Sequence, residues 1–127
     1  IIEQYNIDWG RGPALHYLVA DASGRAALVE FHEGEMMVLS NEEPYHLATN
    51  HLRNTASGDG GCLRYAILDD RLSEAKGQLT SQDAVDLLGG VAQESTQWSI
   101  VYGISTGDVR VAMGLDYDDV HTFRLDR

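Results

Sequence analysis

The sequence has little positive charge. Its 127 residues include nine Lys and Arg against 20 Asp and Glu, which gives a formal net charge of −11. Proteins that bind nucleic acid neutralise its phosphates with clustered Lys and Arg, whereas this chain has a single lysine, Lys76. The composition therefore argues against nucleic acid as a partner, and against anionic membrane surfaces for the same reason.

Cysteine and long apolar runs are also scarce. Cys62 is the only cysteine, so no intramolecular disulfide can form, and this usage is compatible with a reducing compartment. No run of about 18 apolar residues could span a bilayer, and no basic segment followed by an apolar stretch opens the chain. We therefore expect a cytoplasmic protein without a membrane anchor, with residues 1–127 forming a single domain.

The apolar pattern predicts strands in both halves of the chain and helices between them. The expected strands lie at residues 15–20, 26–31, 36–39, 98–102, 109–113 and 120–125. A long irregular segment follows the third strand, and the expected helices lie at residues 62–72 and 80–91. Because strands and helices do not alternate strictly, this order predicts an α+β fold with antiparallel sheets and two helices.

Two of these elements carry the clearest signals. Residues 15–20 are apolar on both alternating faces, which indicates a strand covered on both sides. The second helix is expected to start near residues 80–83, where a hydroxyl of Thr80 or Ser81 can cap it, and Asp83 lies in its first turn, where the helix dipole favours an acidic side chain. The predicted core-facing stripe of this helix consists of Ala84, Leu87, Leu88 and Val91.

Two short patterns suggest catalytic or metal sites but have simpler interpretations. Residues 103–107 fit the G-x-S-x-G pattern around Ser105, yet a strand rather than a helix is expected after them, so we predict a hairpin turn. Glu43 and His46 have the spacing of a di-iron helix pair, but Pro44 lies between them and no second pair exists. We therefore expect neither a metal site nor a cofactor.

Three other features have structural interpretations. The acidic run 116–119 lacks the glycine and the glutamate of a calcium-binding loop, so we expect a solvated turn there. His16 lies on an apolar strand and is expected to be a buried imidazole satisfied by the backbone. Cys62 is expected to be a small, partly buried helix residue.

Asn50 and Arg64 are the candidate catalytic residues. Asn50 follows the third strand, and an amide at a strand end can donate a hydrogen bond to a developing oxyanion. Arg64 opens the first helix, where the helix dipole disfavours a positive charge, so a role outside helix stability is indicated. From spacing alone, an asparagine turn and a surface arginine are equally good interpretations.

Several segments occur in an order that is similar to a known enzyme family. They are LHYLVADASG (15–24), ALVEF (27–31), ATNH (48–51), RY (64–65), LTSQD (79–83), TQWSIVY (96–102) and VRVA (109–112). Together they resemble the choloylglycine hydrolase and penicillin V acylase family of linear amide C–N hydrolases, with the related acyl-coenzyme A:6-aminopenicillanate acyltransferases. The resemblance runs through most of the chain.

The resemblance implies an N-terminal-nucleophile hydrolase with an αββα sandwich. In that family a cysteine at the mature N-terminus attacks the amide carbonyl, and its own α-amino group is the base. Asn50 matches the asparagine of the family's T-N motif, which donates to the oxyanion. Arg64 matches the arginine that opens the following helix and orders the site.

The family's nucleophile has no counterpart in this chain. Residue 1 is isoleucine, and Cys62 lies inside the chain without a free α-amine. We therefore expect the C-terminal part of a larger linear amide hydrolase or acyltransferase, with the N-terminal portion of the parent chain and a small-molecule amide as its partners. We expect the isolated chain to be inactive and to form homo-oligomers through uncovered sheet surface. The alternative is a non-catalytic module that retains the fold and binds a ligand or partner.

Overall fold

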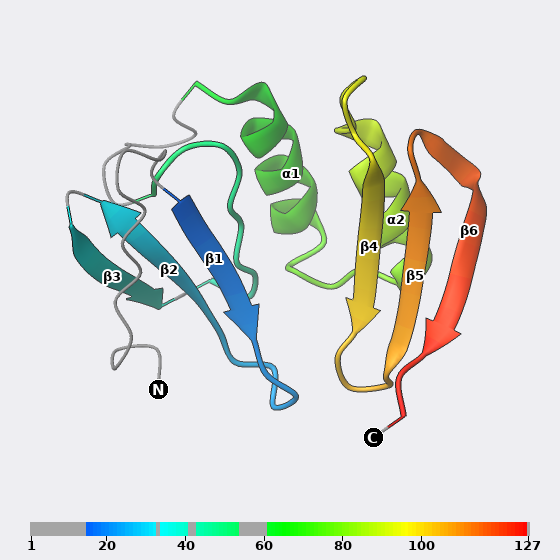
Figure 1. Cartoon of the computed structure of the whole chain (residues 1–127), viewed down its shortest axis with the longest axis horizontal. Coiled ribbons are helices and arrows are strands. Elements are labelled where there is room, and N and C mark those ends of the chain that lie inside the picture. The colour runs from blue at the N-terminus through cyan, green and yellow to red at the C-terminus, as the bar shows by residue number, and fades with distance from the viewer. Residues whose placement is uncertain (1–14, 33, 41–42, 54–60, 127) are drawn as a thin grey trace.

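Two three-stranded antiparallel sheets and two helices make up the computed structural model (Figure 1). The structure describes residues 15–32, 34–40, 43–53 and 61–126. The elements are β1 (Leu15–Ala20), β2 (Ala26–His32), β3 (Glu35–Ser40), α1 (Leu63–Glu74), α2 (Ser81–Gly90), β4 (Trp98–Gly103), β5 (Asp108–Met113) and β6 (Asp116–Arg124). This confirms the predicted α+β class and the order of the elements. No helix within the described ranges is long and apolar enough to cross a membrane.

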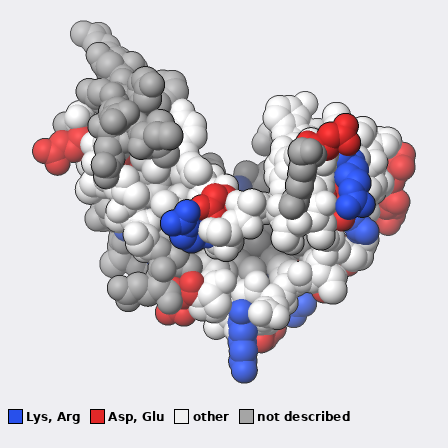
Figure 2. All heavy atoms as spheres, turned by 90° about the horizontal axis from the view of Figure 1, so that it is seen from below, with Lys and Arg blue, Asp and Glu red and all other residues white. Residues whose placement is uncertain are grey.

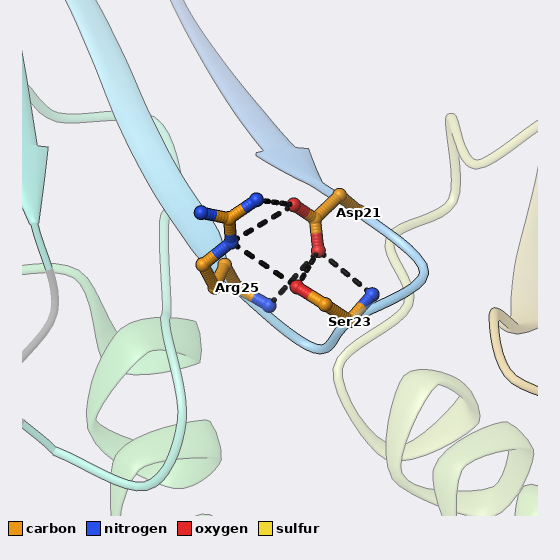
Figure 3. Close-up of polar contacts among 3 residues, drawn as sticks. All are labelled: Asp21, Ser23 and Arg25. Carbon is orange, nitrogen blue, oxygen red and sulfur yellow. Dashed lines mark hydrogen bonds and ion pairs between the residues drawn. The ribbon is translucent and has the colours of Figure 1, made fainter.

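The first sheet has the order β1-β2-β3, and Asp21 fixes the turn between its first two strands (Figure 3). The Asp21 carboxylate accepts hydrogen bonds from the Ser23 backbone N–H at 2.8 Å and from the Ser23 hydroxyl at 2.5 Å. Its other oxygen accepts from the Arg25 guanidinium at 2.9 Å. These donors, the Ser23 hydroxyl foremost, hold the pKa of Asp21 at about 2.

The prediction that residues 15–20 are covered on both sides is wrong. β1 is an edge strand, and its side chains Tyr17, Leu18 and Val19 are 41%, 49% and 43% exposed. The covered strand is β2, where residues 28–30 are all fully buried. β2 is the central strand because it pairs with both β1 and β3. Apolar residues on both faces of β1 suggested a central strand, but this pattern also occurs in an edge strand.

The two faces of this sheet have different surroundings. Glu30 of β2 accepts a hydrogen bond from the Arg53 backbone N–H at 2.6 Å, so its face lies against the irregular segment 43–53. Side chains alternate along a strand, which places Tyr17 and Val38 on the opposite face, and both are exposed. This face therefore carries exposed apolar side chains on its outer strands, while Val29 and Phe31 of the central strand are buried on it.

α1 ends in a Schellman motif. The Lys76 N–H donates to the Ser73 carbonyl at 3.0 Å, and the Gly77 N–H donates to the Leu72 carbonyl at 2.8 Å. Lys76 adopts a φ of 53°, in the left-handed region that glycine usually occupies at this position. Gly77 has a φ of 70°, and a Cβ there would lie 2.6 Å from the Pro44 carbonyl oxygen. The end of α1 is therefore packed closely against the irregular segment.

The hydroxyl cap predicted at the start of α2 is confirmed, and the capping residue is Thr80. The Thr80 hydroxyl oxygen accepts from the Asp83 N–H at 3.1 Å, while the Asp83 carboxylate accepts from the Thr80 N–H at 3.1 Å. This reciprocal pair is a capping box, and it satisfies two backbone donors that the helix itself cannot satisfy.

The predicted core-facing stripe of α2 is only partly correct. Val85, which lies outside that stripe, is the buried residue of the helix, and Gly89 lies against the Tyr117 ring, where a Cβ would be 3.1 Å away. Leu87 instead lines a cavity that α2 forms together with α1. The helix therefore packs toward both the second sheet and α1. One predicted stripe of apolar residues could not account for two buried surfaces.

The second sheet has the order β4-β5-β6. The hairpin between β4 and β5 contains Ser105 and is closed by N–H groups of Thr106 and Gly107, which donate to the Gly103 carbonyl at 3.0 and 2.7 Å. A strand follows it, which confirms the hairpin turn predicted for Ser105.

The acidic side chains of residues 116–119 are exposed, as predicted, but the turn predicted there is wrong. The turn falls at residues 114–115, and β6 already begins at Asp116. The strand is irregular there, because Met113 pairs with Asp116 while Ala112 pairs with Val120. The Asp116 carboxylate accepts from the N–H groups of residues 118 and 119 at 3.3 and 3.2 Å, so the acidic run forms a bulge within the strand.

α2 covers only one face of the second sheet. Arg110 of β5 donates to the Gln82 side chain at 2.8 Å, which places Arg110 on the helix side. The alternating side chains of the three strands lie on the opposite face, and the large exposed ones are Trp98, Tyr102, Met113 and Phe123. The second sheet thus has one face against α2 and one face with exposed aromatic or aliphatic side chains, whereas in the first sheet exposed and buried apolar side chains share a face.

Lys and Arg are dispersed over the molecular surface. On the face drawn in Figure 2, they lie among Asp and Glu and form no continuous positive patch within the described residues. This distribution agrees with the scarcity of basic residues in the sequence.

Candidate functional site

Asn50 lies in a cavity at one end of the first sheet. The cavity has a volume of about 400 Å³ and is lined by Leu15, His16, Thr49, Asn50, His51 and Leu52. Asn50 itself is exposed. Residues 49–52 belong to the irregular segment after β3, and the edge strand β1 supplies the other wall. A cavity of this kind leaves the Asn50 amide accessible to a small molecule.

His16 forms part of one wall of this cavity. The prediction that the backbone satisfies its imidazole is wrong, because its partner is a side chain. Its Nδ1 lies 3.7 Å from Oε1 of Glu30, which is directly opposite on β2 and fully buried. The same oxygen accepts the hydrogen bond from the Arg53 N–H. Glu30 therefore connects the first sheet to the segment that carries Asn50. Both contacts are long-range and require the folded chain to be seen.

The prediction that Cys62 is a helix residue is wrong. Cys62 is the N-cap of α1 and is partly buried, as expected. The Thr49 hydroxyl donates to its sulfur at 3.4 Å and also lies 3.3 Å from Nδ1 of His51. The Thr49 hydroxyl, with smaller contributions from the backbone N–H groups of Tyr65 and Arg64, lowers the pKa of the Cys62 thiol. Cys62 is therefore a more acidic thiol than an ordinary cysteine, a property that the sequence did not indicate.

Arg64 lies in the first turn of α1, as predicted, and is partly buried. No acidic residue accompanies it in that turn. Its positive charge contributes to the lowered pKa of Cys62. Because Thr49 precedes Asn50 and contacts Cys62, the segment that carries Asn50 lies at the N-terminal end of α1, although Arg64 does not line the cavity of Asn50.

Tyr65 connects this end of α1 to a second cavity. Its buried ring makes an edge contact with the His51 ring at a centroid distance of 5.1 Å. The Arg53 guanidinium carbon lies 4.7 Å from the centre of the Tyr65 ring, a cation–π contact. Burial raises the pKa of Tyr65, so the phenol stays neutral.

The second cavity has a volume of about 750 Å³ and was not anticipated from the sequence. It lies between the first sheet, the irregular segment and α1, and its polar lining includes Glu43, Tyr45, His46, Arg53 and Asp69. Tyr45 donates to Asp69 at 2.7 Å across a sequence separation of 24 residues. The polar residues at 43–46 were the available signal, but only the folded chain shows that they lie opposite α1.

Two groups in this cavity have altered acidity. The hydrogen bond to Asp69, together with burial and the Asp69 charge, raises the pKa of Tyr45 to about 12. Burial, followed by the charge of Arg53, lowers the pKa of His46. Near neutral pH both side chains are therefore uncharged hydrogen-bonding groups.

Glu43 and His46 do not form the helical pair that their spacing suggests, because residues 43–46 have no helical structure. Within the described residues, no three His, Cys, Asp or Glu side chains are grouped as metal ligands. The long irregular segment, predicted from Ser40 to Gly61, is confirmed for residues 43–53, whereas Ser40 still belongs to β3. Residues 41–42 and 54–60 lie outside the described residues.

Comparison with protein-family models, with curated proteins and with solved structures finds no match to this chain.

Proposed function

We propose that the chain is the C-terminal part of a linear amide C–N hydrolase or acyltransferase of the choloylglycine hydrolase type. The N-terminal portion of the parent chain supplies a cysteine whose thiolate attacks the amide carbonyl. The C–N bond breaks, the amine leaves with the proton from the thiol, and the acyl group remains as a thioester. Water or a second amine then takes the acyl group. A cytoplasmic location, where thiols stay reduced, suits this nucleophile.

The observation that carries the proposal is the position of Asn50. Asn50 is exposed and lines a cavity of about 400 Å³, which supports its side-chain amide as a hydrogen-bond donor to a bound substrate. The developing oxyanion of an amide carbonyl needs such a donor, held on a framework that does not reorganise during the reaction. Glu30 supports that framework through its contacts with His16 and Arg53.

Arg64 acts as a positioning residue in this proposal. It lies in the first turn of α1, where the helix dipole opposes its charge, so the helix gains nothing from it. The charge adds positive potential at this end of α1, and it is the smallest of the contributions that lower the pKa of Cys62. A positive potential of this kind favours a thiolate and the tetrahedral intermediate.

The exposed apolar side chains on the two sheets support the N-terminal portion of the parent chain as a partner. In an αββα sandwich each sheet has helices on one face and the other sheet on the other. Here Tyr17 and Val38 lie exposed on the first sheet, and Trp98 and Phe123 lie exposed on the second. Sheet faces of this composition are typical of surfaces that pack against further protein.

The experiment that tests the proposal is the hydrolysis of N-acyl p-nitroanilides by the full-length parent protein. We expect hydrolysis, and we expect Asn50→Ala to lower kcat by about 10²- to 10³-fold, the usual effect of losing one oxyanion donor. Gln93→Ala removes an exposed side-chain amide beyond α2 and should leave kcat unchanged. Equal activity of Asn50→Ala and the parent protein would overturn the role of Asn50, and no amide hydrolysis would overturn the function.

A non-catalytic binding module is the second candidate, and the exposed sheet faces also favour it. The two candidates differ in the coding sequence upstream of Ile1. A cysteine that becomes N-terminal after processing supports the enzyme, whereas its absence supports the module.

A further inference from the structure

A groove of about 620 Å³ lies between the two helices. Its lining residues on each helix have the three- and four-residue spacing of one helix face: 67, 71, 74 and 75 on α1, and 83, 86, 87 and 90 on α2. Gln78 and Leu79, in the connection between the helices, complete the lining. No residue of the Asn50 cavity lines this α1–α2 groove, so the groove is separate from the proposed catalytic site.

The α1–α2 groove contains an apolar strip. Ile67 and Leu87 line the groove from opposite helices, and Leu79 of the connection adds a third apolar side chain. Leu63, one turn before Ile67 on the same face of α1, is 74% exposed, and Ile67 is 37% exposed. Burying these side chains against another protein removes apolar surface from water, which favours association.

The rim of the groove is acidic. On the α1 wall Arg71 donates to Glu74 at 3.2 Å, so these two opposite charges offset each other. On the α2 wall Asp83 and Asp86 accept hydrogen bonds from neutral groups. The hydrogen bonds from the N-cap of α2 lower the pKa of Asp83, so this carboxylate stays ionised near neutral pH. One arginine against three carboxylates leaves the lining with a net charge of −2.

We propose that the α1–α2 groove binds a basic amphipathic helix of a protein partner. The apolar face of that helix packs on the apolar strip, and its Lys or Arg side chains lie against Asp83 and Asp86 at the rim. Two helix faces joined by a short connection form a cradle of the shape that a third helix fills, with its own apolar residues at i, i+3, i+4 and i+7.

The charge of the rim selects among possible occupants. An acidic helix would bring like charge to the two aspartates, which costs affinity. A second copy of this chain carries a net charge of −11, so it is repelled from the rim in the same way. A basic helix is the occupant that matches both the apolar strip and the rim.

Fluorescence anisotropy of the 127-residue chain tests this proposal with three labelled peptides of about 15 residues. The first consists of leucine, alanine and lysine with the leucines on one helix face. The second has glutamate in place of every lysine, and the third has the composition of the first in scrambled order. We expect the first peptide to bind at least about tenfold more tightly than either of the others. Equal affinity for the first peptide and either of the others would overturn the proposal.

Two variants distinguish the groove from general attraction of a basic peptide to an acidic chain. Ile67→Ser should weaken binding of the lysine peptide about fivefold, because apolar contact area is lost. Asp86→Lys should weaken it about tenfold and should strengthen binding of the glutamate peptide.

The matched controls are Leu125→Ser and Asp118→Lys, since both residues are exposed and lie outside the groove. They should leave the affinity for the lysine peptide unchanged within about twofold. Circular dichroism establishes that all four variants are folded. Losses in the controls equal to those in the groove variants would overturn the proposal, and this result is independent of any amide hydrolysis.

Discussion

At the scale of single residues, Asp21 shows how one turn sets the acidity of a carboxyl group. The Ser23 hydroxyl is the main cause of its pKa of about 2, against an ordinary value of 3.8. Ser23→Ala should therefore raise the pKa of Asp21 toward 3.8, as measured by NMR titration of the carboxyl carbon. Ser95→Ala, at another exposed serine, is the control. An unchanged pKa in Ser23→Ala would contradict this origin.

The sign of the associated pH dependence follows from linkage. The pKa of Asp21 is lower in the folded chain, so its contribution to stability is present above pH 3.8 and is lost as the pH falls toward 2. The difference in melting temperature between the parent chain and Ser23→Ala should therefore be largest near neutral pH and should disappear in acid.

The Cys62 thiol gives a second prediction at this scale. Thr49 donates to its sulfur and lowers its pKa, so the thiolate is more populated near neutral pH than in an ordinary cysteine. Thr49→Val should raise that pKa and slow alkylation by iodoacetamide about fivefold, which corresponds to one hydrogen bond. Thr122→Val, on β6, should leave the rate unchanged. Equal alkylation rates for Thr49→Val and the parent chain would contradict the contact.

At the scale of elements, two neighbouring residues at the end of α1 should respond in opposite ways to substitution. Lys76 occupies a left-handed conformation that favours glycine, so Lys76→Gly should stabilise the chain by about 1 kcal/mol. Gly77→Ala should destabilise it, because the new Cβ would lie 2.6 Å from the Pro44 carbonyl oxygen. Urea denaturation measures both free energies of unfolding. A destabilised Lys76→Gly would contradict the Schellman motif.

The elements themselves were largely predictable, because local patterns determine them. Thr80 and Asp83 identified the start of α2, and the turn around Ser105 was recognised from the strand that follows it. The exposure of β1 was missed because the order of strands in a sheet is a long-range property. Val85 was missed for a similar reason, since the covered surface of α2 depends on what packs against it.

The candidate site was predictable only as separate residues. Asn50 and Arg64 could be named from the sequence, but the Thr49–Cys62 contact that brings their segments together requires the folded chain. The same holds for Tyr45 and Asp69, which are far apart in the sequence and whose contact helps form the larger cavity. Their side chains carry no local pattern that reveals this pairing.

At the scale of the whole molecule, exposed apolar faces and a net charge of −11 act in opposite directions. The faces around Tyr102 and Phe123 favour association, while like charge opposes it. We expect the isolated chain to form oligomers whose population rises with salt, since salt screens the repulsion. Sedimentation velocity measures this, and Tyr102→Ser with Phe123→Ser should shift the chain toward monomer. A monomer at every salt concentration would contradict the prediction.

The central proposal concerns chemistry that this chain completes with an upstream cysteine. Its most direct test is the position of the acyl group in the full-length parent protein, quenched in acid while it hydrolyses an N-acyl p-nitroanilide and analysed by peptide mass spectrometry. We expect a thioester on a cysteine upstream of Ile1, and less of it when Asn50 is replaced by Ala. A thioester on Cys62, or hydrolysis without any acyl-cysteine, would contradict the proposal.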